Sequence, residues 1–295
     1  MKNYLDKIVF IILNYNSCNV TMQCYKDLRN LSDKFNIIIV DNNSSDDSQK
    51  QFQNIKDGNM KFIISDSNKG YAAGNNIGLR YVGANMPQIK VAFIINPDIK
   101  IDCIDYIYKL YDALMSDNSL AAITSLTIYN GKCNFPNECC WKFLDKNQVV
   151  LNSSLIGKIL KKDIKYKKMT VNNMVSYVDV VQGCFFGIKM DVLRKIDFLD
   201  ERTFLYCEEQ ILGRKIQKIG MKSGVLINTY IYHNHFEKDK TLANRKSLIF
   251  HMDCLKNSRK VLIDDYLKLN RFQKILRNTF LELDMWFKKI FIFLK

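Results

Sequence analysis

The chain has 295 residues, of which 47% are apolar and 25% charged, and this composition excludes a mainly disordered protein and allows one large α/β domain or two small ones. Its nine cysteines include no Cys-x-x-Cys pair and follow no secretory signal, so we expect buried thiols in a cytoplasmic protein rather than a zinc site or disulfides. Much of the formal net charge of +14 lies in residues 158–168 and 238–295, which favours an anionic membrane surface, a phosphorylated substrate or a solvated surface over a nucleic acid.

Four near-continuous apolar runs predict strands that are covered on both faces. They occupy residues 7–13, 36–40, 61–64 and 91–96. Helical patterns lie between them: one begins after Ser17, which suits a helix N-cap, and another runs from Tyr71 to Ala84. The alternation of strands and helices predicts an α/β fold, with a mainly parallel sheet flanked by helices.

Polar residues follow three of these runs at the point where each strand is expected to end. They are "NYNS" at 14–17, "DNNSSDDS" at 41–48 and "NPD" at 96–98. Ligands of parallel α/β sheets bind at the carboxyl ends of the strands, so these residues predict a ligand site there. Asn, Ser and Asp are also ordinary turn residues, but three such ends in succession favour a site.

The glycines at positions 70, 74 and 78 fit neither the dinucleotide fingerprint G-x-G-x-x-G nor the Walker phosphate loop. A spacing of four residues instead predicts one helix face that packs closely on its neighbour. Hydride transfer and ATP hydrolysis are therefore disfavoured.

Asp98 is a candidate metal ligand just beyond the strand at 91–96. Mg²⁺ in proteins is commonly held by one or two carboxylates together with phosphate oxygens and water. Pro97 fixes the turn and has no amide hydrogen, so we expect it to direct Asp98 outward rather than continue the strand. The alternative is a turn residue that binds no metal.

The chain is less regular over residues 130–172, which we interpret as a loop over the site or an acceptor-binding insertion. A strand at 177–183 and a helix at 190–195 follow, and a further helical pattern begins at Glu208 and Glu209. Adjacent carboxylates repel each other, which raises the pKa of one of them and suits a general base. The alternative is that both acids only complement the helix dipole.

A last strand at 224–233 ends at His233, and His235 lies two residues further on. Either imidazole could bind a metal together with Asp98, or form a hydrogen bond in a loop. His233 is the stronger candidate of the two.

Two long helical patterns, at about 241–262 and 269–294, close the chain. The second places a set of apolar residues on one side: Phe272, Ile275 or Leu276, Phe280, Leu283, Trp286 or Phe287, and Ile290. Lysines and arginines lie between them, which predicts a basic amphipathic helix in a membrane interface rather than a spanning helix. The alternative is a core helix of the same domain.

The segments "ILNYNS", "IIIVDNNSSDDS", "NKGYAAGNNIGL", "FIINPDI", "GCFFGIKMDVL", "FLDERTFLYCEEQILGRK" and "IYHN" follow one another over residues 7–235. In this order they resemble glycosyltransferase family 2, the inverting enzymes of GT-A fold. The resemblance implies a GT-A domain over 1–236, with a nucleotide-sugar half to about residue 130 and an acceptor half over 131–236. Residues 237–295 would form a separate basic, amphipathic helical segment.

The resemblance implies a nucleotide-sugar site made from three segments. Its residues would contact the base, the pyrimidine edge and the nucleoside. They are Leu13 and Asn14 for the base, Asp41 for the pyrimidine, and Gly70, Asn75 and Asn76 for the nucleoside.

The resemblance also implies the reacting groups. Asn96 and Asp98 match the family's metal motif, so Asp98 would hold Mg²⁺ or Mn²⁺ against the donor diphosphate, with His233 as a further candidate ligand. Glu209 would be the general base that deprotonates the acceptor hydroxyl, and Glu208 is the reserve candidate. The chain departs from the common pattern at Asn96 and Glu209, where aspartate is more frequent, and at Ile211, which replaces a frequent acid.

The implied function is inverting, metal-dependent transfer of a sugar from a UDP or dTDP donor to a glycan hydroxyl. The nearest branch contains rhamnosyltransferase-like bacterial enzymes of surface polysaccharide synthesis, so we expect a lipid-linked oligosaccharide acceptor and a cytoplasmic protein peripheral to the inner membrane face. One alternative is a catalytically degenerate nucleotide-sugar-binding scaffold, given the motif departures. Another is a sugar-phosphate nucleotidyltransferase, which the lack of Gly and Lys in "IILNYNSCNV" disfavours.

Overall fold

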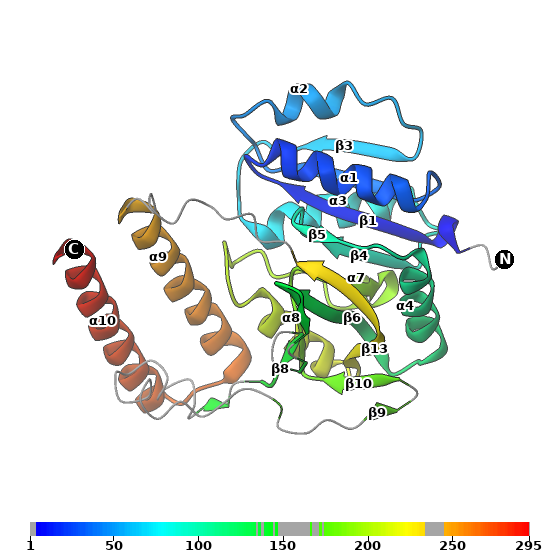
Figure 1. The fold of residues 1–295 in the computed structure, drawn as a ribbon. Coiled ribbons are helices and arrows are strands. Elements are labelled where there is room, and N and C mark those ends of the chain that lie inside the picture. Colours follow the sequence, from blue (N-terminus) through cyan, green and yellow to red (C-terminus); the bar gives the residue numbers. More distant parts are fainter. Residues whose placement is uncertain are drawn as a thin grey trace.

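The computed structural model describes residues 4–133, 135–136, 139–143, 145–146, 166, 171–172, 174–233 and 245–294. Most of the irregular region at 130–172, including its lysine-rich part, lies outside the described residues, as does His235. The described chain begins with a short 3-10 helix, η1 (Leu5–Lys7), and is built on one twisted sheet with helices on both faces (Figure 1).

The first half of the sheet is parallel and has the strand order β3-β2-β1-β4. Its strands are β1 (Ile8–Asn14), β2 (Asn36–Asp41), β3 (Met60–Ile64) and β4 (Val91–Ile95). All four predicted strands are therefore confirmed within one or two residues at each end. β1 and β4 lie at the centre of the sheet and are almost completely buried, as continuous apolar runs predict.

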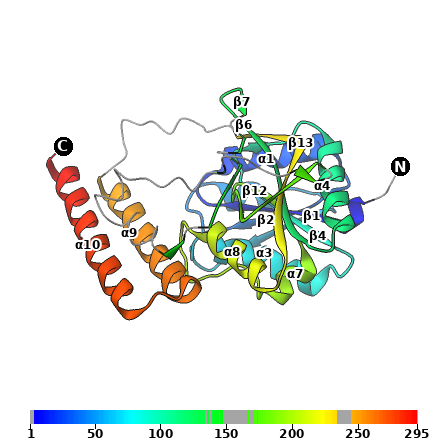
Figure 2. The ribbon, with the colours of Figure 1, turned by 90° about the horizontal axis from the view of Figure 1, so that it is seen from below.

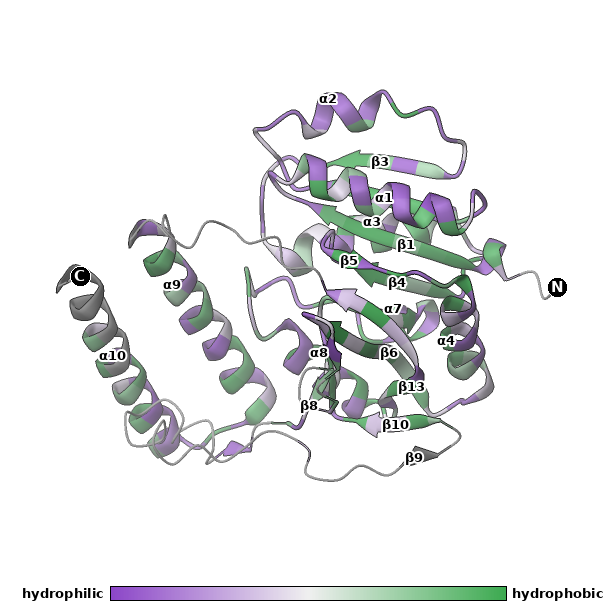
Figure 3. Cartoon of the chain, viewed as in Figure 1, coloured by the Kyte–Doolittle hydropathy of each residue, from purple (hydrophilic) through white to green (hydrophobic). Residues whose placement is uncertain are grey.

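Helices cover both faces of the sheet, which explains why the strands do not alternate polar and apolar residues. The helices α1 (Cys18–Leu31), α2 (Ser48–Gln53) and α4 (Ile104–Ser116) bury apolar side chains against one face. The helices α3 (Tyr71–Asn85), α7 (Met190–Lys195) and α8 (Glu208–Lys218) pack on the other. Figure 3 shows the apolar strands inside and the mixed polar and apolar helices outside them.

The glycines of α3 do pack closely on the sheet, as their spacing predicts. A Cβ atom added at Gly74 would lie 2.5 Å from Leu13 Cδ1, and one at Gly78 would lie 3.0 Å from Ile11 Cγ2 and 3.1 Å from Val40 Cγ2. Larger residues at these positions would push α3 away from β1 and β2. The close contact fixes the N-terminus of α3 near the carboxyl ends of these strands.

The second half of the sheet is mixed. β12 (Phe185–Lys189) runs antiparallel to both β4 and β6 (Leu120–Tyr129), and β13 (Lys222–His233) runs parallel to β6. The outer strands are β10 (Val175–Val178) and β9 (Val171–Asn172), while β7 (Lys132–Cys133) pairs with β6. A short β5 (Ile99–Lys100) pairs with the end of β13, which brings His233 beside Ile99.

The strand predicted at 177–183 is divided into two. Its first part belongs to β10, and its second part, β11 (Val180–Val181), pairs with β8 (Cys140–Trp141) in a separate two-stranded sheet. The break occurs at Asp179, whose backbone N–H donates to Tyr166 Oη (2.8 Å) instead of to a neighbouring strand.

The chain ends in two neighbouring helices that lie beside the sheet and its covering helices (Figures 1 and 2). They are α9 (Arg245–Val261) and α10 (Arg271–Leu294), joined through a short π-helix, η3 (Leu262–Leu267). We call these three elements the C-terminal hairpin. Among the helices described here, none combines the length and the apolar character needed to cross a bilayer.

Candidate active site

Two predicted site residues meet at the carboxyl ends of β1 and β2. Asn14 and Asp41 are paired in register, and Asn14 Nδ2 donates a hydrogen bond of 2.7 Å to Asp41 Oδ1. The Oδ1 atom of Asn14 accepts a bond of 2.7 Å from Thr21 Oγ1 in α1. Both side chains are fully buried.

The second carboxylate oxygen of Asp41 is also engaged. It accepts from the backbone N–H of Ser44 at 2.9 Å and from Gln49 Nε2 at 3.1 Å. Asp41 therefore stabilises the loop after β2, and its Oδ2 atom already accepts two hydrogen bonds within the protein.

Gly70, at the N-terminus of α3, is in close contact with the loop that precedes α8. Its φ angle is +94°, and an added Cβ would lie 2.1 Å from Phe204 O. The following N–H, that of Tyr71, donates to the same carbonyl at 2.9 Å. Only glycine fits this position, because both the φ angle and the space exclude a side chain.

The two adjacent asparagines of α3, Asn75 and Asn76, form different contacts. Asn76 Nδ2 donates to Leu199 O (2.9 Å) and Glu201 Oε1 (2.7 Å), and its Oδ1 accepts from Leu199 N (3.1 Å). Asn76 thus holds the chain before α8. Asn75 Nδ2 donates to Tyr71 O at 3.0 Å, while its buried Oδ1 has no hydrogen-bond donor.

Asn42 carries a second buried amide oxygen without a donor. Its Nδ2 donates to Asn68 Oδ1 (2.8 Å), and its Cγ lies 3.3 Å from the position of a Cβ on Gly74, next to Leu13. A buried acceptor without a partner is costly, so the oxygens of Asn42 and Asn75 are available for the hydroxyl or N–H groups of a ligand. Asn42 lies in the polar segment 41–48 that predicted a ligand site, although it was not a named site residue.

Asp98 and His233 are brought together from positions far apart in the sequence. Pairing of β5 with β13 places His233 Nε2 3.2 Å from Asp98 Oδ2, and both side chains are partly exposed. Two ligands on adjacent corners of an octahedron with bonds of about 2.1 Å are separated by about 3 Å, so this pair fits one divalent cation. No group of three or more His, Cys, Asp or Glu that could hold a metal occurs among the described residues, so diphosphate oxygens and water would have to complete the shell.

Glu208 and Glu209 begin α8, as predicted. The two preceding residues, Tyr206 and Cys207, have positive φ angles of 77° and 68°, and this turn directs the helix start toward the interior. The Oε1 atom of Glu209 lies so near Gly183 that an added Cβ there would be 2.3 Å away.

Burial raises the pKa of both glutamates. Desolvation is the main cause at Glu208, and the charge of Glu209 adds to it, so that the pKa of Glu208 is raised to about 8. At Glu209 burial again raises the pKa, against backbone hydrogen bonding at the helix start. A buried carboxyl pair with raised pKa values is suited to proton transfer.

One cavity of about 500 Å³ connects these groups. The predicted residues that line it are Asn96, Glu208, Glu209 and His233. Asp98 is not among the lining residues, but it contacts one of them, His233. The remaining lining residues are Tyr71, Thr127, Tyr129, Trp141, Gln182, Gly183, Cys184, Leu205, Tyr206 and Cys207. Leu13, Asn14, Asp41, Gly70, Asn75 and Asn76 do not line the cavity and lie around the ends of β1 and β2 and the start of α3.

Several lining residues escaped the sequence analysis. Tyr71 Oη donates to Gly183 O at 2.6 Å, and Thr127 Oγ1 donates to Gln182 Oε1 at 2.6 Å, which fixes the floor of the cavity. The sequence could have indicated Gln182 as a site residue, because it is a polar residue at the end of an apolar run. Trp141 could not have been indicated in this way, because only pairing of β8 with β11 brings it to the cavity.

Comparison with known proteins identifies the family of this chain. The family model described as Glycosyl transferase family 2 matches residues 9–197. The low-salt glycan biosynthesis hexosyltransferase Agl10 of Haloferax volcanii is 28% identical over 205 residues, which cover 70% of this chain and 60% of the relative. The chain thus spans 60% of the length of this curated relative.

Solved structures of glycosyltransferases share the fold. GalNAc-T7, crystallised with UDP, GalNAc and Mn²⁺, has a TM-score of 0.59 at 14% identity, over 79% of this chain and 44% of its own. The mannosyltransferase PcManGT of Pyrobaculum calidifontis, with GDP-Man and Mn²⁺, has a TM-score of 0.56 at 13% identity, over 97% and 72%. TarS 1-349 of S. aureus has a TM-score of 0.51 at 14% identity, over 93% and 69%. The predicted fold of GT-A type is confirmed.

Proposed function

Because the chain belongs to glycosyltransferase family 2, we propose that it transfers a sugar, with inversion and with a divalent cation, from a UDP or dTDP donor to a hydroxyl of a glycan acceptor. The observation that supports this most strongly is the cavity lined by both glutamates and by His233, whose imidazole contacts Asp98. We further propose a lipid-linked acceptor in bacterial surface polysaccharide synthesis. The hexosyltransferase name of the relative and the nucleotide sugars in the solved structures are consistent with the general activity.

The donor nucleoside would occupy the region around Leu13, Gly70 and the two unpaired amide oxygens of Asn42 and Asn75. These oxygens accept hydrogen bonds, so they suit ribose hydroxyls and base N–H groups. Asp41 would accept a hydrogen bond from a pyrimidine N–H, and Asn14 would act indirectly, because its amide holds the Asp41 carboxylate in place.

Asp98 and His233 would hold Mg²⁺ or Mn²⁺, and Asn96 would lie beside them in the cavity. When bound, the cation supplies positive charge that offsets the negative charge developing on the leaving diphosphate. A carboxylate and an imidazole form a small donor set, which leaves room for diphosphate oxygens.

Glu209 would act as the general base, with Glu208 as the alternative. Its carboxylate takes the proton of the acceptor hydroxyl, and the oxygen attacks the anomeric carbon from the face opposite the diphosphate. The bond between that carbon and the diphosphate oxygen breaks, the electron pair leaves with the diphosphate, and the anomeric configuration inverts. Tyr71 and Gln182 hold the surrounding backbone and so fix the cavity floor.

Donor hydrolysis by water in place of an acceptor should rise with pH. The base acts in its ionised form, and burial raises the pKa of the Glu208–Glu209 pair, in the case of Glu208 from 4.5 to about 8. We expect the turnover number to climb through this window. Folding stability should fall over the same window, because a carboxyl with a raised folded-state pKa stabilises the fold below its unfolded pKa and loses this contribution as pH rises.

The measurement is nucleoside diphosphate release from UDP-, dTDP- and GDP-sugars with Mn²⁺, as a function of pH. A turnover that does not change across the window would contradict the assignment of the buried pair. Complete absence of hydrolysis would favour the nucleotide-sugar-binding scaffold.

The C-terminal hairpin presents apolar side chains to solvent, which supports a membrane surface as a further partner. On α10 the exposed members recur at helical spacing on one side: Phe272, Ile275, Leu283, Trp286 and Phe287. Phe272 is 72% exposed and Trp286 59%. The opposite side, with Arg277 and Leu281, is buried. An outward apolar stripe in a segment with fourteen Lys or Arg against six Asp or Glu over residues 238–295 suits an anionic bilayer.

We expect the full-length protein to co-sediment with phosphatidylserine-containing vesicles at low salt. Replacing Phe272 and Trp286 by serine should lower the bound fraction about 10-fold, since two aromatic side chains no longer enter the interface. Met115→Ser is the matched control, because Met115 is an exposed apolar residue on α4, away from the hairpin. Wild-type protein that stays in the supernatant would contradict a membrane partner.

A further inference from the structure

The loop of residues 197–207 connects α7 to α8 and builds one side of the cavity. Its last three residues, Leu205, Tyr206 and Cys207, line the cavity and lead directly into Glu208. Four of its residues have positive φ angles: Asp197, Phe198, Tyr206 and Cys207. Such angles cost free energy outside glycine, so contacts from other elements must hold this loop in place.

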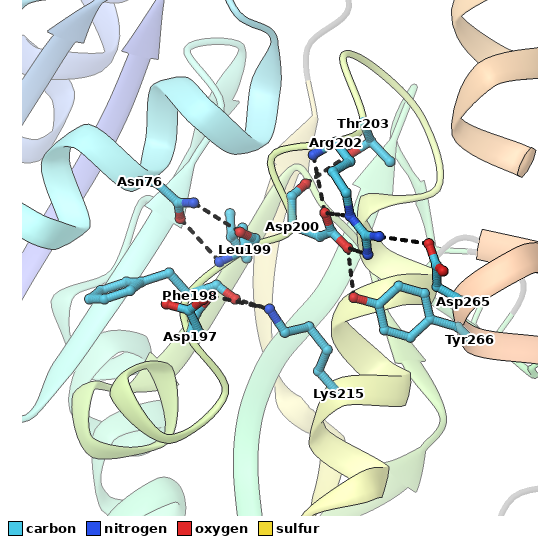
Figure 4. A network of polar contacts seen from close by, with 10 residues as sticks. All are labelled: Asn76, Asp197, Phe198, Leu199, Asp200, Arg202, Thr203, Lys215, Asp265 and Tyr266. Atoms are coloured by element: carbon cyan, nitrogen blue, oxygen red, sulfur yellow. Dashed lines mark hydrogen bonds and ion pairs between the residues drawn. The ribbon is translucent and has the colours of Figure 1, made fainter. Parts of the chain in front are cut away.

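The start of the loop is held by the helices that cover the sheet. Asn76 in α3 exchanges two hydrogen bonds with Leu199, and Lys215 Nζ in α8 donates to Phe198 O at 2.7 Å and to Asp197 O at 3.2 Å (Figure 4). These contacts hold the first third of the loop. Helix α3 also reaches the loop further on, where Asn76 Nδ2 donates to Glu201 Oε1 (2.7 Å) and the Tyr71 N–H donates to Phe204 O (2.9 Å).

The middle of the loop is held by the C-terminal hairpin, through four side chains that we call the latch: Asp200, Arg202, Asp265 and Tyr266. Arg202 Nε donates to Asp200 Oδ1 (2.9 Å) and its Nη1 to Asp265 Oδ2 (2.6 Å), while Tyr266 Oη donates to Asp200 Oδ2 (2.6 Å). Figure 4 shows the guanidinium between the two carboxylates.

Asp200 is the centre of the latch. Its side chain is only 7% exposed, and burial alone would raise its pKa, but hydrogen bonds from Arg202 and Tyr266 outweigh this and lower the pKa to about 2. The carboxylate is therefore ionised at any physiological pH, and its charge-assisted hydrogen bonds are of the strong kind.

The end of the loop also rests on α9. The rings of Phe204 and Phe250 meet edge to face with centroids 5.5 Å apart, and Ser258 Oγ donates to Leu205 O at 2.8 Å. Tyr206 Oη and His251 Nδ1 are 2.9 Å apart. The hairpin thus contacts the loop as far as Tyr206.

We propose that Arg202 and Tyr266 are positioning residues, through which the C-terminal hairpin sets the 197–207 loop and with it the Glu208–Glu209 pair. The inference rests on the proposed function, because it assigns the pair to catalysis. It follows that the hairpin completes the active site as well as presenting the apolar stripe. Misplacement of reacting groups by about 1 Å can cost about 100-fold in rate, so a modest shift of this loop is sufficient.

The test compares Arg202→Ala, Tyr266→Phe and the double variant with Lys256→Ala. Lys256 pairs with Glu282 and joins α9 to α10, and its ammonium forms none of the hydrogen bonds described for the loop, so Lys256→Ala is the control for a change within the hairpin. UDP-, dTDP- and GDP-sugars with Mn²⁺ are the probes. The readouts are the turnover number and KM of donor hydrolysis, the Kd of the matching nucleoside diphosphate, and amide hydrogen exchange of residues 197–207.

Arg202→Ala should lower the turnover number at least about 10-fold and leave the donor KM and diphosphate Kd within about twofold, since the nucleotide is bound elsewhere. In this variant, amide hydrogen exchange should be faster in residues 197–207 and at the Tyr71 N–H, which donates to Phe204 O in the loop. Exchange in β1 should not change. Arg202→Lys should recover part of the turnover number that Arg202→Ala loses. The double variant should be no slower than the slower of the two single variants, because Arg202 and Tyr266 act together in the latch. Lys256→Ala should match wild type.

Wild-type turnover in Arg202→Ala would overturn the inference, as would equal losses in Arg202→Ala and Lys256→Ala, which would indicate general stabilisation by the hairpin. A wild-type protein that neither binds nor hydrolyses any donor would instead refute the proposed function. In that case, amide hydrogen exchange of residues 197–207 that is the same in Arg202→Ala and in wild type would still contradict the claim that the latch holds the loop.

Discussion

Glu209→Gln is expected to slow sugar transfer at least about 100-fold, the scale for losing a general base, while the variant folds and binds nucleotide. Glutamine has nearly the same shape but cannot accept a proton. The carboxylate lies against the backbone at Gly183 within the cavity, so the amide can occupy the same space. The measurement is the single-turnover rate of donor hydrolysis, or of transfer once an acceptor is known, beside the nucleotide Kd.

Two further variants sharpen this test. Glu282→Gln makes the same chemical change on α10, where the side chain pairs with Lys256, and should leave the rate unaltered. Glu208→Gln distinguishes the two candidates, because the true base should show the larger loss. Near-normal turnover in Glu209→Gln together with a large loss in Glu208→Gln would transfer the role to Glu208. Normal turnover in both would contradict base catalysis by this pair.

Asp98→Ala is expected to remove the metal-dependent part of donor binding. Asp98 and His233 are the proposed protein ligands of the cation. Loss of a group that only orients a metal ligand already lowers metal affinity about 10- to 100-fold, so loss of the Asp98 carboxylate should raise the Mn²⁺ Kd by at least that factor. Mn²⁺ titration of the protein with bound diphosphate measures it. His233→Ala should show a loss of the same kind.

The matched control is Asp105→Ala, which removes an exposed carboxylate from the first turn of α4. It should bind Mn²⁺ and nucleotide as wild type does. If Asp98→Ala retained wild-type Mn²⁺ affinity, the pair would be a structural hydrogen bond and the cation would have to bind elsewhere.

The parallel half of the fold could be predicted from the sequence because its signal is local. Apolar runs such as "KIVFIIL" predict strands that are buried on both faces. The spacing of the glycines predicts close packing of α3, and in the structure these glycines pack on Ile11 and Leu13. Pairing partners are not local. Nothing in "CFFGI" indicates that β12 inserts antiparallel between β4 and β6, and an apolar run does not show that Asp179 interrupts it.

The site could be predicted where strand ends carry polar residues, and less well where tertiary contacts decide. The sequence predicted that His233 could bind a metal together with Asp98, and the structure places His233 Nε2 3.2 Å from Asp98 Oδ2. The carboxylate of Asp41 and the amide of Asn76 are instead occupied by hydrogen bonds within the protein. Composition at a strand end does not reveal whether a polar group is satisfied internally.

The central claim, that this chain binds a nucleotide-sugar donor through a cation, is tested most directly by its melting temperature in the presence of UDP, dTDP and GDP and their sugars, with Mn²⁺, Mg²⁺ or chelator. A donor at 100 times its Kd adds about 2.7 kcal/mol, or about 5 °C for a chain of this size. We predict such a rise for UDP or dTDP compounds, dependent on metal and absent in Asp98→Ala. No rise with any nucleotide, in the presence of either metal, would contradict the claim.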